Sequence, residues 1–216
     1  MLSNIFKRIA NLLSLRSRRE KLDLFMREMS PTPQSCILDV GMAATPRYEE
    51  RKTNILEREW PWKSQLIAIS RDYPSVAKQH HPLVKMIQAD GCQLPLANES
   101  VDYVWSNAVI EHVGDMEQQR AFVLEALRVA REGVFIATPD CAFPLEIHSN
   151  LPFIHWLPKR ARDAIFNFLG FRWMNSISLL SEREFGELFP SGTEVRIIRQ
   201  RITLLPYNLV ALVRKP

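Results

Sequence analysis

The feature that most constrains this 216-residue chain is a pair of apolar runs that each end in polar, turn-forming residues. The first run, Cys36 to Leu38, ends in Asp39-Val40-Gly41, and the second, Val84 to Ala89, ends in Asp90-Gly91-Cys92. Short apolar runs with such ends predict buried strands of a parallel sheet. Glycine lets the backbone approach a ligand, and the carboxyl ends of parallel strands share one sheet edge. The sequence therefore predicts an α/β fold with a ligand crevice at that edge.

The remaining apolar patterns extend this α/β prediction along the chain. Strands are expected at residues 36–40, 65–70, 84–89, 101–106 and 134–138, followed by an antiparallel pair at 193–203 and 207–213 that turns at Pro206. Helices are expected as one or two amphipathic segments before Pro31 and Pro33, and at residues 48–59 and 117–131, the last ending at a C-cap glycine, Gly133.

Composition narrows the classes of protein. Lys and Arg number 28 against 24 Asp and Glu, and so small an excess does not indicate a nucleic-acid partner. Three cysteines, Cys36, Cys92 and Cys141, lack disulfide or metal-type spacing, which indicates a reducing, cytoplasmic compartment. No apolar run is long enough to span a bilayer, and the first residues lack a signal-peptide cleavage site, so neither segment is expected.

Three segments in order, ILDVG, ADGCQLPLANESVDYVWSNAVIEHV and GVFIATPD, resemble the class I S-adenosylmethionine-dependent methyltransferases. The second segment is the most specific, because many nucleotide-binding folds offer a turn like the first. The resemblance is to a methyltransferase type 11-like domain of a bacterial subgroup without an assigned substrate. It implies a doubly wound, seven-stranded, mostly parallel sheet in the order 3-2-1-4-5-7-6. It also implies S-adenosylmethionine as the cofactor and an oxygen, nitrogen or carbon atom as the methyl acceptor.

The resemblance assigns cofactor-binding residues to the strand ends. It places the first loop, with Asp39, Gly41 and Ala43, at the methionine part of the cofactor, and Asn107 and Ala108 beside it. Asp90 is expected to accept a hydrogen bond from the adenine amino group, and the amide of Gly91 or Cys92 to contact the ring. Where the family has an acidic ribose ligand this chain has Ser70, with Asp72 two residues later. Asp72 is either the ribose ligand or the N-cap of the next helix.

The first loop departs from the family. The usual D-x-G-x-G-x-G pattern reads Asp39-Val40-Gly41-Met42-Ala43-Ala44-Thr45 here, so only the first glycine is kept. Each added methyl group limits backbone approach to the cofactor. Two interpretations follow: an altered but working loop in an enzyme, or a methyltransferase fold that has lost activity and serves as a binding or regulatory partner. The retained remainder of the site favours the enzyme.

Catalytic candidates come from two segments. Glu111 and His112 are adjacent polar residues in an apolar run, where Glu111 is interpreted as a loop anchor and His112 as either structural or catalytic. The second segment is an insertion at about residues 140–175, rich in aromatic residues and proline. Within it, Glu146 and His148 share one face if the segment is extended, so Glu146 would orient His148 as a general base. A hydrogen-bonded lid histidine is the simpler alternative.

The sequence also bears on whether the chain binds a metal ion or a membrane. His148, His155 and Cys141 have no recognisable ligand spacing, so the sequence predicts no metal site. The chain divides into an N-terminal basic amphipathic segment, residues 1–30, and a methyltransferase domain, residues 31–216. Residues 1–19 and 151–162 each combine apolar and basic side chains, which suggests peripheral contact with an anionic membrane and a lipid-linked acceptor. A cytoplasmic enzyme with a small soluble acceptor is the alternative.

Overall fold

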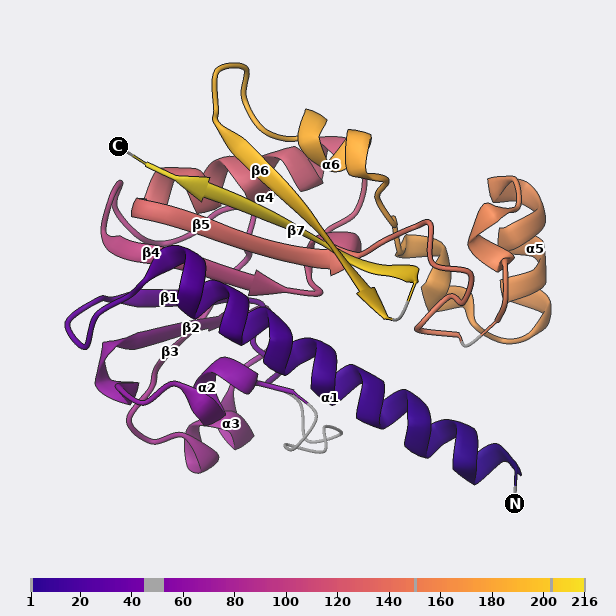
Figure 1. Ribbon diagram of the computed structural model, residues 1–216, viewed down its shortest axis with the longest axis horizontal. Coiled ribbons are helices and arrows are strands. Elements are labelled where there is room, and N and C mark those ends of the chain that lie inside the picture. Colours follow the sequence, from indigo (N-terminus) through magenta and orange to yellow (C-terminus); the bar gives the residue numbers. More distant parts are fainter. Residues whose placement is uncertain (1, 45–52, 150, 203, 216) are drawn as a thin grey trace.

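The computed structural model describes residues 2–44, 53–149, 151–202 and 204–215, with side chains described from residue 14 onward. Its centre is one sheet in the order β3-β2-β1-β4-β5-β7-β6, which confirms the expected fold (Figure 1). The strands are β1 (Ile37–Val40), β2 (Leu66–Ser70), β3 (Lys85–Gln88), β4 (Val101–Asn107), β5 (Ala130–Pro139), β6 (Val195–Ile202) and β7 (Leu205–Arg214). The first five run parallel, whereas β7 is antiparallel to both β5 and β6.

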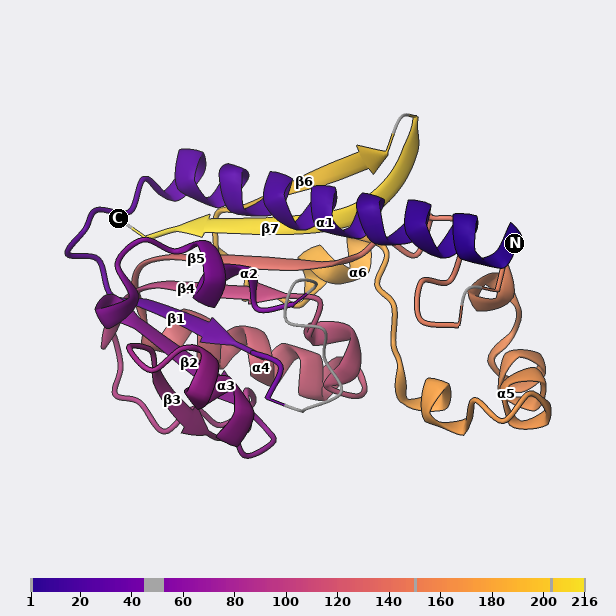
Figure 2. The ribbon, with the colours of Figure 1, turned by 90° about the horizontal axis from the view of Figure 1, so that it is seen from below.

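Helices cover both faces of this sheet (Figure 2). They are α1 (Leu2–Met29), α2 (Ile55–Glu59), α3 (Ser75–His80), α4 (Met116–Val129), α5 (Lys159–Phe168) and α6 (Glu182–Glu187). One apolar core lies between the sheet and α1, α2 and α3, and a second lies between the sheet, α4 and α6. Among the described residues, no helix is both long and apolar enough to cross a bilayer.

The N-terminal segment is one continuous helix, and its second half belongs to the first core. Phe25 is fully buried and meets Trp105 and Phe135 edge-on, with ring centroids 5.3 and 5.6 Å apart. Such edge contacts add about 0.5–1.5 kcal/mol each to the burial of the ring. Residues 20–29 therefore pack on the sheet.

Two predictions of where an element ends are wrong: Gly133 as a helix C-cap and Pro206 as a turn. α4 ends at Val129, and Gly133 lies inside β5 rather than capping the helix. The glycine is needed because a Cβ there would lie 2.8 Å from the backbone oxygen of Val213. Pro206 likewise lies within β7, opposite Arg201, and the chain reverses before it, between Ile202 and Leu205. A bulge between Gln200 and Arg201 interrupts the ladder next to this proline, which has no N–H to donate.

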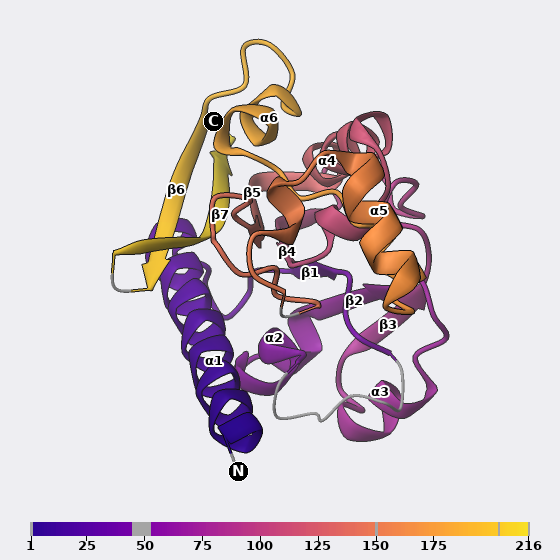
Figure 3. The same cartoon turned by 90° about the vertical axis from the view of Figure 1, so that its right-hand side faces the viewer.

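The expected insertion follows β5 and forms a small layer at one end of the molecule (Figure 3). It contains α5 and two short 3-10 turns, η4 (Ile154–Trp156) and η5 (Arg172–Ser176). Ile154, Phe166, Met174 and Ile177 give it a core of its own. A bridge between Asp140 and Leu180 closes the insertion at its base, so the layer is anchored to the end of β5.

Candidate functional site

Asp39, at the end of β1, lies in a buried acidic pair. Its partner is Glu57 of α2, which is fully buried. Burial, and next the Glu57 carboxylate, raise the pKa of Asp39 well above its ordinary range. The Glu57 oxygens have no hydrogen-bond partner among the described residues if Asp39 is ionised, whereas a protonated Asp39 can donate to them. The two carboxyl groups therefore form a desolvated pair below the first loop, in which negative charge is disfavoured.

Gly41 joins the first loop to the segment after β4. Its φ of +104° suits glycine, and a Cβ there would lie 2.1 Å from Cγ2 of Val109. On the same segment Ala108 has a φ of +58°, a conformation rare for a non-glycine residue. The Oδ1 atom of Asn107 is buried without a partner among the described residues. Here the backbone at Gly41 lies close to Val109, and the Oδ1 atom of Asn107 is a buried hydrogen-bond acceptor without a donor among the described residues.

Ala43 lies in the altered loop, and its backbone is already paired. Asn54 accepts a hydrogen bond from the Ala43 amide at 3.0 Å and donates to its carbonyl at 2.9 Å. Ala43 therefore shapes the loop rather than offering a free amide. Asn54 has a φ of +50° and was missed by the sequence analysis, where nothing distinguishes it from a surface asparagine. Thr45, together with the expected helix start at residues 48–52, lies outside the described residues.

At the end of β2, Ser70 and Asp72 differ in orientation. Ser70 is buried, and its hydroxyl accepts a hydrogen bond from the Asp72 amide at 3.3 Å. The carboxylate of Asp72 is exposed. The N-cap interpretation of Asp72 is wrong, because α3 begins at Ser75 with Pro74 as its N-cap. Asp72 is therefore the better placed of the two for a ribose.

Asp90, Gly91 and Cys92 form a tight turn after β3. The carboxylate of Asp90 accepts from the Cys92 amide at 2.9 Å, while its carbonyl accepts from Gln93 at 3.0 Å. Gly91 packs on Phe122, where a Cβ would lie 2.6 Å from the ring. Burial, and next the Asp90 charge, raise the pKa of Cys92 to about 11. The turn presents an exposed carboxylate at the same sheet edge as Asp39 and Asp72.

On the other side of the sheet edge, Glu111 lies on the 3-10 turn η3 (Ile110–His112). It is fully buried. One of its oxygens, Oε2, accepts from the hydroxyl of Thr138 on β5 at 3.1 Å, and its backbone carbonyl accepts from the Ser178 amide at 2.9 Å. Burial raises the pKa of Glu111. The side chain anchors the loop, as the sequence suggested, and burial disfavours its charged form.

His148 and Glu146 do meet, although the segment between them is a turn and not an extended strand. Oε1 of Glu146 accepts from the His148 amide at 3.0 Å and lies 2.6 Å from its Nδ1. Oε2 accepts from the Ser149 amide and hydroxyl. Burial alone would raise the pKa of Glu146, but the hydrogen bonds from His148 and Ser149 lower it to about 2. A buried, ionised carboxylate therefore fixes the imidazole of His148.

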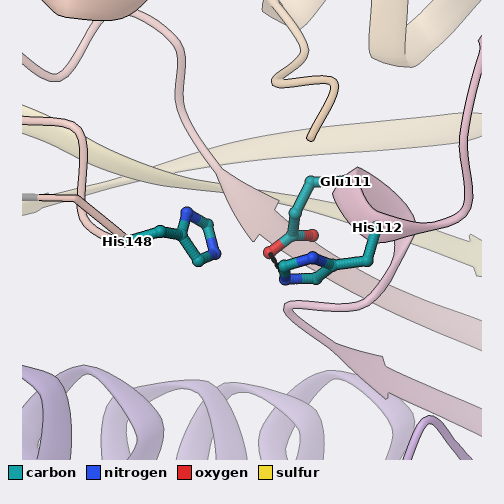
Figure 4. Close-up of side chains that lie close together, drawn as sticks. All are labelled: Glu111, His112 and His148. Atoms are coloured by element: carbon teal, nitrogen blue, oxygen red, sulfur yellow. Dashed lines mark ion pairs between the residues drawn. The ribbon is translucent and has the colours of Figure 1, made fainter. Parts of the chain in front are cut away.

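The insertion brings His148 against His112. The two rings meet edge-on with centroids 4.9 Å apart, and His112 Nε2 lies 3.9 Å from Glu111 Oε1 (Figure 4). Burial, and next the charge of His148, lower the pKa of His112 to about 4. Lys21 of α1 is buried on the same side, where desolvation, and next the charge of Arg18, lower its pKa to about 7, while Glu111 opposes the shift. Three distant segments of the chain, α1, η3 and the insertion, thus meet here.

His155 and Trp156, also in the insertion, form hydrogen bonds within it. His155 Nε2 and the indole N–H of Trp156 both lie within hydrogen-bond distance of the Cys141 carbonyl, at 2.9 and 2.8 Å. His155 therefore braces the insertion and does not join His148. Among the described residues, the histidine, cysteine and acidic side chains that come together in a metal-type group are Glu111, His112 and His148.

Comparison with known proteins finds similarity to methyltransferases in part of the sequence and in the fold. Residues 51–138 match the family model described as a methyltransferase domain, a segment that begins after the first loop. A probable S-adenosylmethionine-dependent methyltransferase of Mycobacterium tuberculosis is 39% identical over 80 residues, which are 35% of this chain and 28% of that protein. The chain thus covers less than a third of the length of this curated relative.

Solved structures share the whole fold. An N-methyltransferase, NodS, from Bradyrhizobium japonicum has a TM-score of 0.57 at 17% identity, over 93% of this chain and 96% of that one. Magnesium protoporphyrin IX methyltransferase from Synechocystis, with bound S-adenosylhomocysteine, has a TM-score of 0.58 at 11% identity, over 98% and 88%. The chain therefore shares the fold of these methyltransferases, and its residues 51–138 match the methyltransferase domain model.

The described residues at the sheet edge fit the cofactor that the resemblance implies. Gly41 keeps the space that a side chain would fill, and Asn107 offers an unsatisfied acceptor. Sequence reasoning missed Glu57 and Lys21, because a glutamate or lysine in an amphipathic helix normally faces solvent. A helical-face count around Phe25 would have drawn attention to Lys21, four residues earlier.

Proposed function

We propose that this chain is an S-adenosylmethionine-dependent methyltransferase that transfers the sulfonium methyl group to a nucleophilic oxygen, nitrogen or carbon atom. The observation that carries the proposal is the contact of Gly41 with Val109, which joins the cofactor loop to the turn bearing Glu111 and His112. Donor and acceptor sites then lie next to each other at one sheet edge. Because the sulfonium is already activated, alignment for in-line attack supplies much of the rate enhancement.

Cofactor binding is assigned to the strand ends. Asp90 and the Gly91–Cys92 backbone bind the adenine, Asp72 binds the ribose with Ser70 bracing its backbone, and Asn107 and Ala108 border the methionine part. Asp39, with Gly41 and Ala43, shapes the floor of the loop. The exposed carboxylates of Asp72 and Asp90 and the paired backbone of Ala43 support this division of roles.

His148 is assigned to the acceptor proton. Glu146 holds its Nδ1 as a donor, which leaves Nε2 to take a proton from an acceptor hydroxyl or ammonium. His112 lies against the same ring and completes the polar wall. A base is needed only for an acceptor that loses a proton during attack, so His148 would be idle with an acceptor that is already anionic.

Calorimetric titration with S-adenosylmethionine and S-adenosylhomocysteine tests the proposal. An enzyme should bind both at micromolar concentrations, with one site per chain. An inactive relative that works as a binding or regulatory partner is the competing function, favoured by the altered loop. The absence of heat at millimolar ligand would establish that competing function. If Asp39→Ala and Asp90→Ala both leave the affinity unchanged, the cofactor pocket has been placed at the wrong strand ends.

We further propose that the acceptor is lipid-linked and that the enzyme works at an anionic membrane surface. The insertion exposes Phe153 and Trp156 by 53% each and Leu157 by 40%, and Lys159 and Arg160 follow directly. Figures 1 and 2 place the N-terminal end of α1 at the same end of the molecule. Each basic residue near an anionic surface adds about 1 kcal/mol of attraction. Arg16, Arg19 and Lys159 contribute less, since each is paired with an acidic side chain.

Sedimentation with liposomes tests the membrane proposal. The full chain should pellet with vesicles that contain phosphatidylglycerol and stay in solution with phosphatidylcholine alone, and salt should release it. Phe153→Ser with Trp156→Ser should abolish pelleting, whereas Leu83→Ser, a control at an exposed leucine before β3, should not. A shortened chain starting at residue 14 tests the N-terminal arm and keeps Ser17, which is buried against Asn208. Wild-type protein that remains in the supernatant with anionic vesicles at low salt would refute membrane binding.

A further inference from the structure

We propose that Glu111, His112 and His148 bind one divalent transition-metal ion of the zinc class on the acceptor side of the site. The inference rests on the proposed function, because it specifies how the acceptor is held and activated. The sequence pattern does not predict this group, since its members come from two segments 36 residues apart. Only the insertion, folding back over η3, brings His148 to the other two (Figure 4).

The ligand atoms are grouped closely enough for one ion to draw them together. One oxygen of Glu111 and one ring nitrogen from each histidine all lie within 4.8 Å of one another. Two imidazoles and one carboxylate are an established ligand set for zinc, in a site that keeps further positions open. Bonds of about 2.0–2.2 Å to zinc require the atoms to close by a small amount. The two imidazole rings already meet edge-on, with centroids 4.9 Å apart.

Glu111 provides an independent sign of a missing partner. The side chain is fully buried, and Oε2 is bonded to Thr138. The other oxygen, Oε1, is buried and has no hydrogen-bond partner among the described residues. An unsatisfied buried carboxylate oxygen is costly, and native structures normally satisfy it. Its neighbour at 3.9 Å is His112 Nε2, so an ion placed between these atoms would satisfy both.

Glu146 supplies the outer support that metal-binding histidines usually have. Its Oε1 lies 2.6 Å from His148 Nδ1, and it is itself held by Ser149. A metal-ligating histidine characteristically donates its second N–H to a carboxylate, which fixes the tautomer and the ring direction. His148 therefore presents the lone pair of Nε2 toward Glu111 and His112. Lys21 is the competing partner, since its buried amine interacts electrostatically with Glu111.

An ion here would change how the acceptor loses its proton. An acceptor hydroxyl bound at an open position becomes far more acidic, as water does on zinc. Its proton passes to solvent, and the resulting metal-bound oxyanion attacks the methyl carbon. The new C–O bond forms as the S–CH3 bond breaks, and the electron pair remains on sulfur as the neutral thioether. The acceptor class is then an alcohol, phenol or acid whose oxygen can bind zinc, and methylation is at oxygen.

Zinc titration of the full chain, after treatment with chelator, tests the proposal by calorimetry. One zinc ion should bind per chain at micromolar or lower concentration, and magnesium should bind at least a hundredfold more weakly, because it prefers all-oxygen sites. His112→Ala and His148→Ala should each weaken zinc binding at least tenfold. His80→Ala, a control at an exposed histidine on α3, should leave it unchanged. Lys21→Met should strengthen it by removing the competing amine.

The outcomes separate this inference from the proposed function. Equal zinc affinity in wild type, His112→Ala and His148→Ala would overturn the metal site, as would no binding at millimolar zinc. If S-adenosylhomocysteine still binds in that case, the methyltransferase function stands and His148 acts as a simple base. Zinc binding without any S-adenosylhomocysteine binding would keep the metal site and remove the proposed enzyme. His112 is partly exposed, so His112→Ala remains a folded test if His148→Ala disturbs the insertion.

Discussion

The cofactor side and the acceptor side of this site are built in opposite ways. Cofactor candidates such as Asp72 and Asp90 are exposed side chains at strand ends, each held by a hydrogen bond within its own turn. On the acceptor side, Glu111 and Glu146 are buried. Glu111 is held by Thr138 on β5, and Glu146 is held by His148 and Ser149 of its own turn. Binding a nucleoside requires solvent-accessible polar groups on a rigid sheet. Proton transfer or metal binding instead requires buried groups that are held in place by hydrogen bonds.

The two sides also differ in charge. At the cofactor side, burial raises the pKa of two acids, Asp39 and Glu57, and so disfavours negative charge at the floor of the loop. At the acceptor side, burial opposes the charge of Lys21 and of Glu111 alike. The difference implies that mutations on the cofactor side should change the affinity for the cofactor, and mutations on the acceptor side should change kcat. The four predictions below run from the largest expected effect to the smallest.

His148→Ala should lower kcat by roughly 100- to 10,000-fold once an acceptor is known, the usual contribution of a positioned acid–base or metal-ligating residue. Affinity for S-adenosylhomocysteine should stay nearly intact, because His148 belongs to the acceptor side. Steady-state kinetics and calorimetry measure the two quantities. Ser149→Ala removes one hydrogen bond to Glu146 and should give a much smaller loss. Equal losses of kcat and cofactor affinity in His148→Ala would erase the distinction between the sides.

Lys21→Met should stabilise the fold at low pH. The pKa of Lys21 is lowered from 10.5 to about 7, so the unfolded chain binds the proton more tightly between these values. Wild-type stability therefore rises with pH across that window. The variant should be more stable by roughly 3–5 kcal/mol below pH 7, and the advantage should vanish near pH 10.5.

Urea unfolding at several pH values measures the effect of Lys21→Met, with Lys78→Met as an exposed control on α3. The same variant should lose turnover if Lys21 contacts the acceptor. A variant that is less stable than wild type at pH 6 would mean that the ammonium group is paired in the folded protein, so that the acceptor side is not desolvated as described.

Asp90→Ala should weaken S-adenosylhomocysteine binding by about 1–3 kcal/mol, the loss of a hydrogen bond to a buried ligand group. Turnover at saturating cofactor should be unchanged, the reverse of His148→Ala. Calorimetry and kinetics on one preparation compare them, and Asp23→Ala on the exposed face of α1 is a suitable control. An Asp90→Ala variant with normal affinity but reduced kcat would show that the sheet edge does not separate the two roles.

Cys92 should report cofactor binding chemically. With its pKa raised to about 11, the thiol should alkylate slowly at pH 8 and about tenfold faster per pH unit toward pH 10. S-adenosylhomocysteine should slow the reaction severalfold, because Cys92 lies in the adenine turn. Iodoacetamide labelling followed by mass spectrometry, in a Cys36→Ser, Cys141→Ser background, measures it. Equal rates with and without the ligand would move the adenine away from this turn.

The strands and their order could be predicted because each is a local apolar run, and the family pattern orders them. Asp39, Asp90 and Asn107 belong to that same local pattern, since they follow strands directly. The predictions that failed concern residues whose conformation depends on a segment that is close in space but not adjacent in the sequence. Gly133 looks like a helix cap, yet the carbonyl of Val213, 80 residues later, demands a glycine there. Pro206 is typical of a turn, but it lies in β7, where it pairs with Arg201 of β6 next to a β-bulge.

The sequence by itself determined the fold, the sheet edge to which we assign the cofactor, and the pairing of Glu146 with His148, which are near in the chain. Tertiary structure alone decided that Lys21, Glu57 and Glu111 are buried, and that His112 meets His148. Burial of a charged residue is a property of what packs over it, and here the covering segments lie far away in the chain. Hydrophobic periodicity records which face of an element is apolar, but not which distant polar groups that face will desolvate.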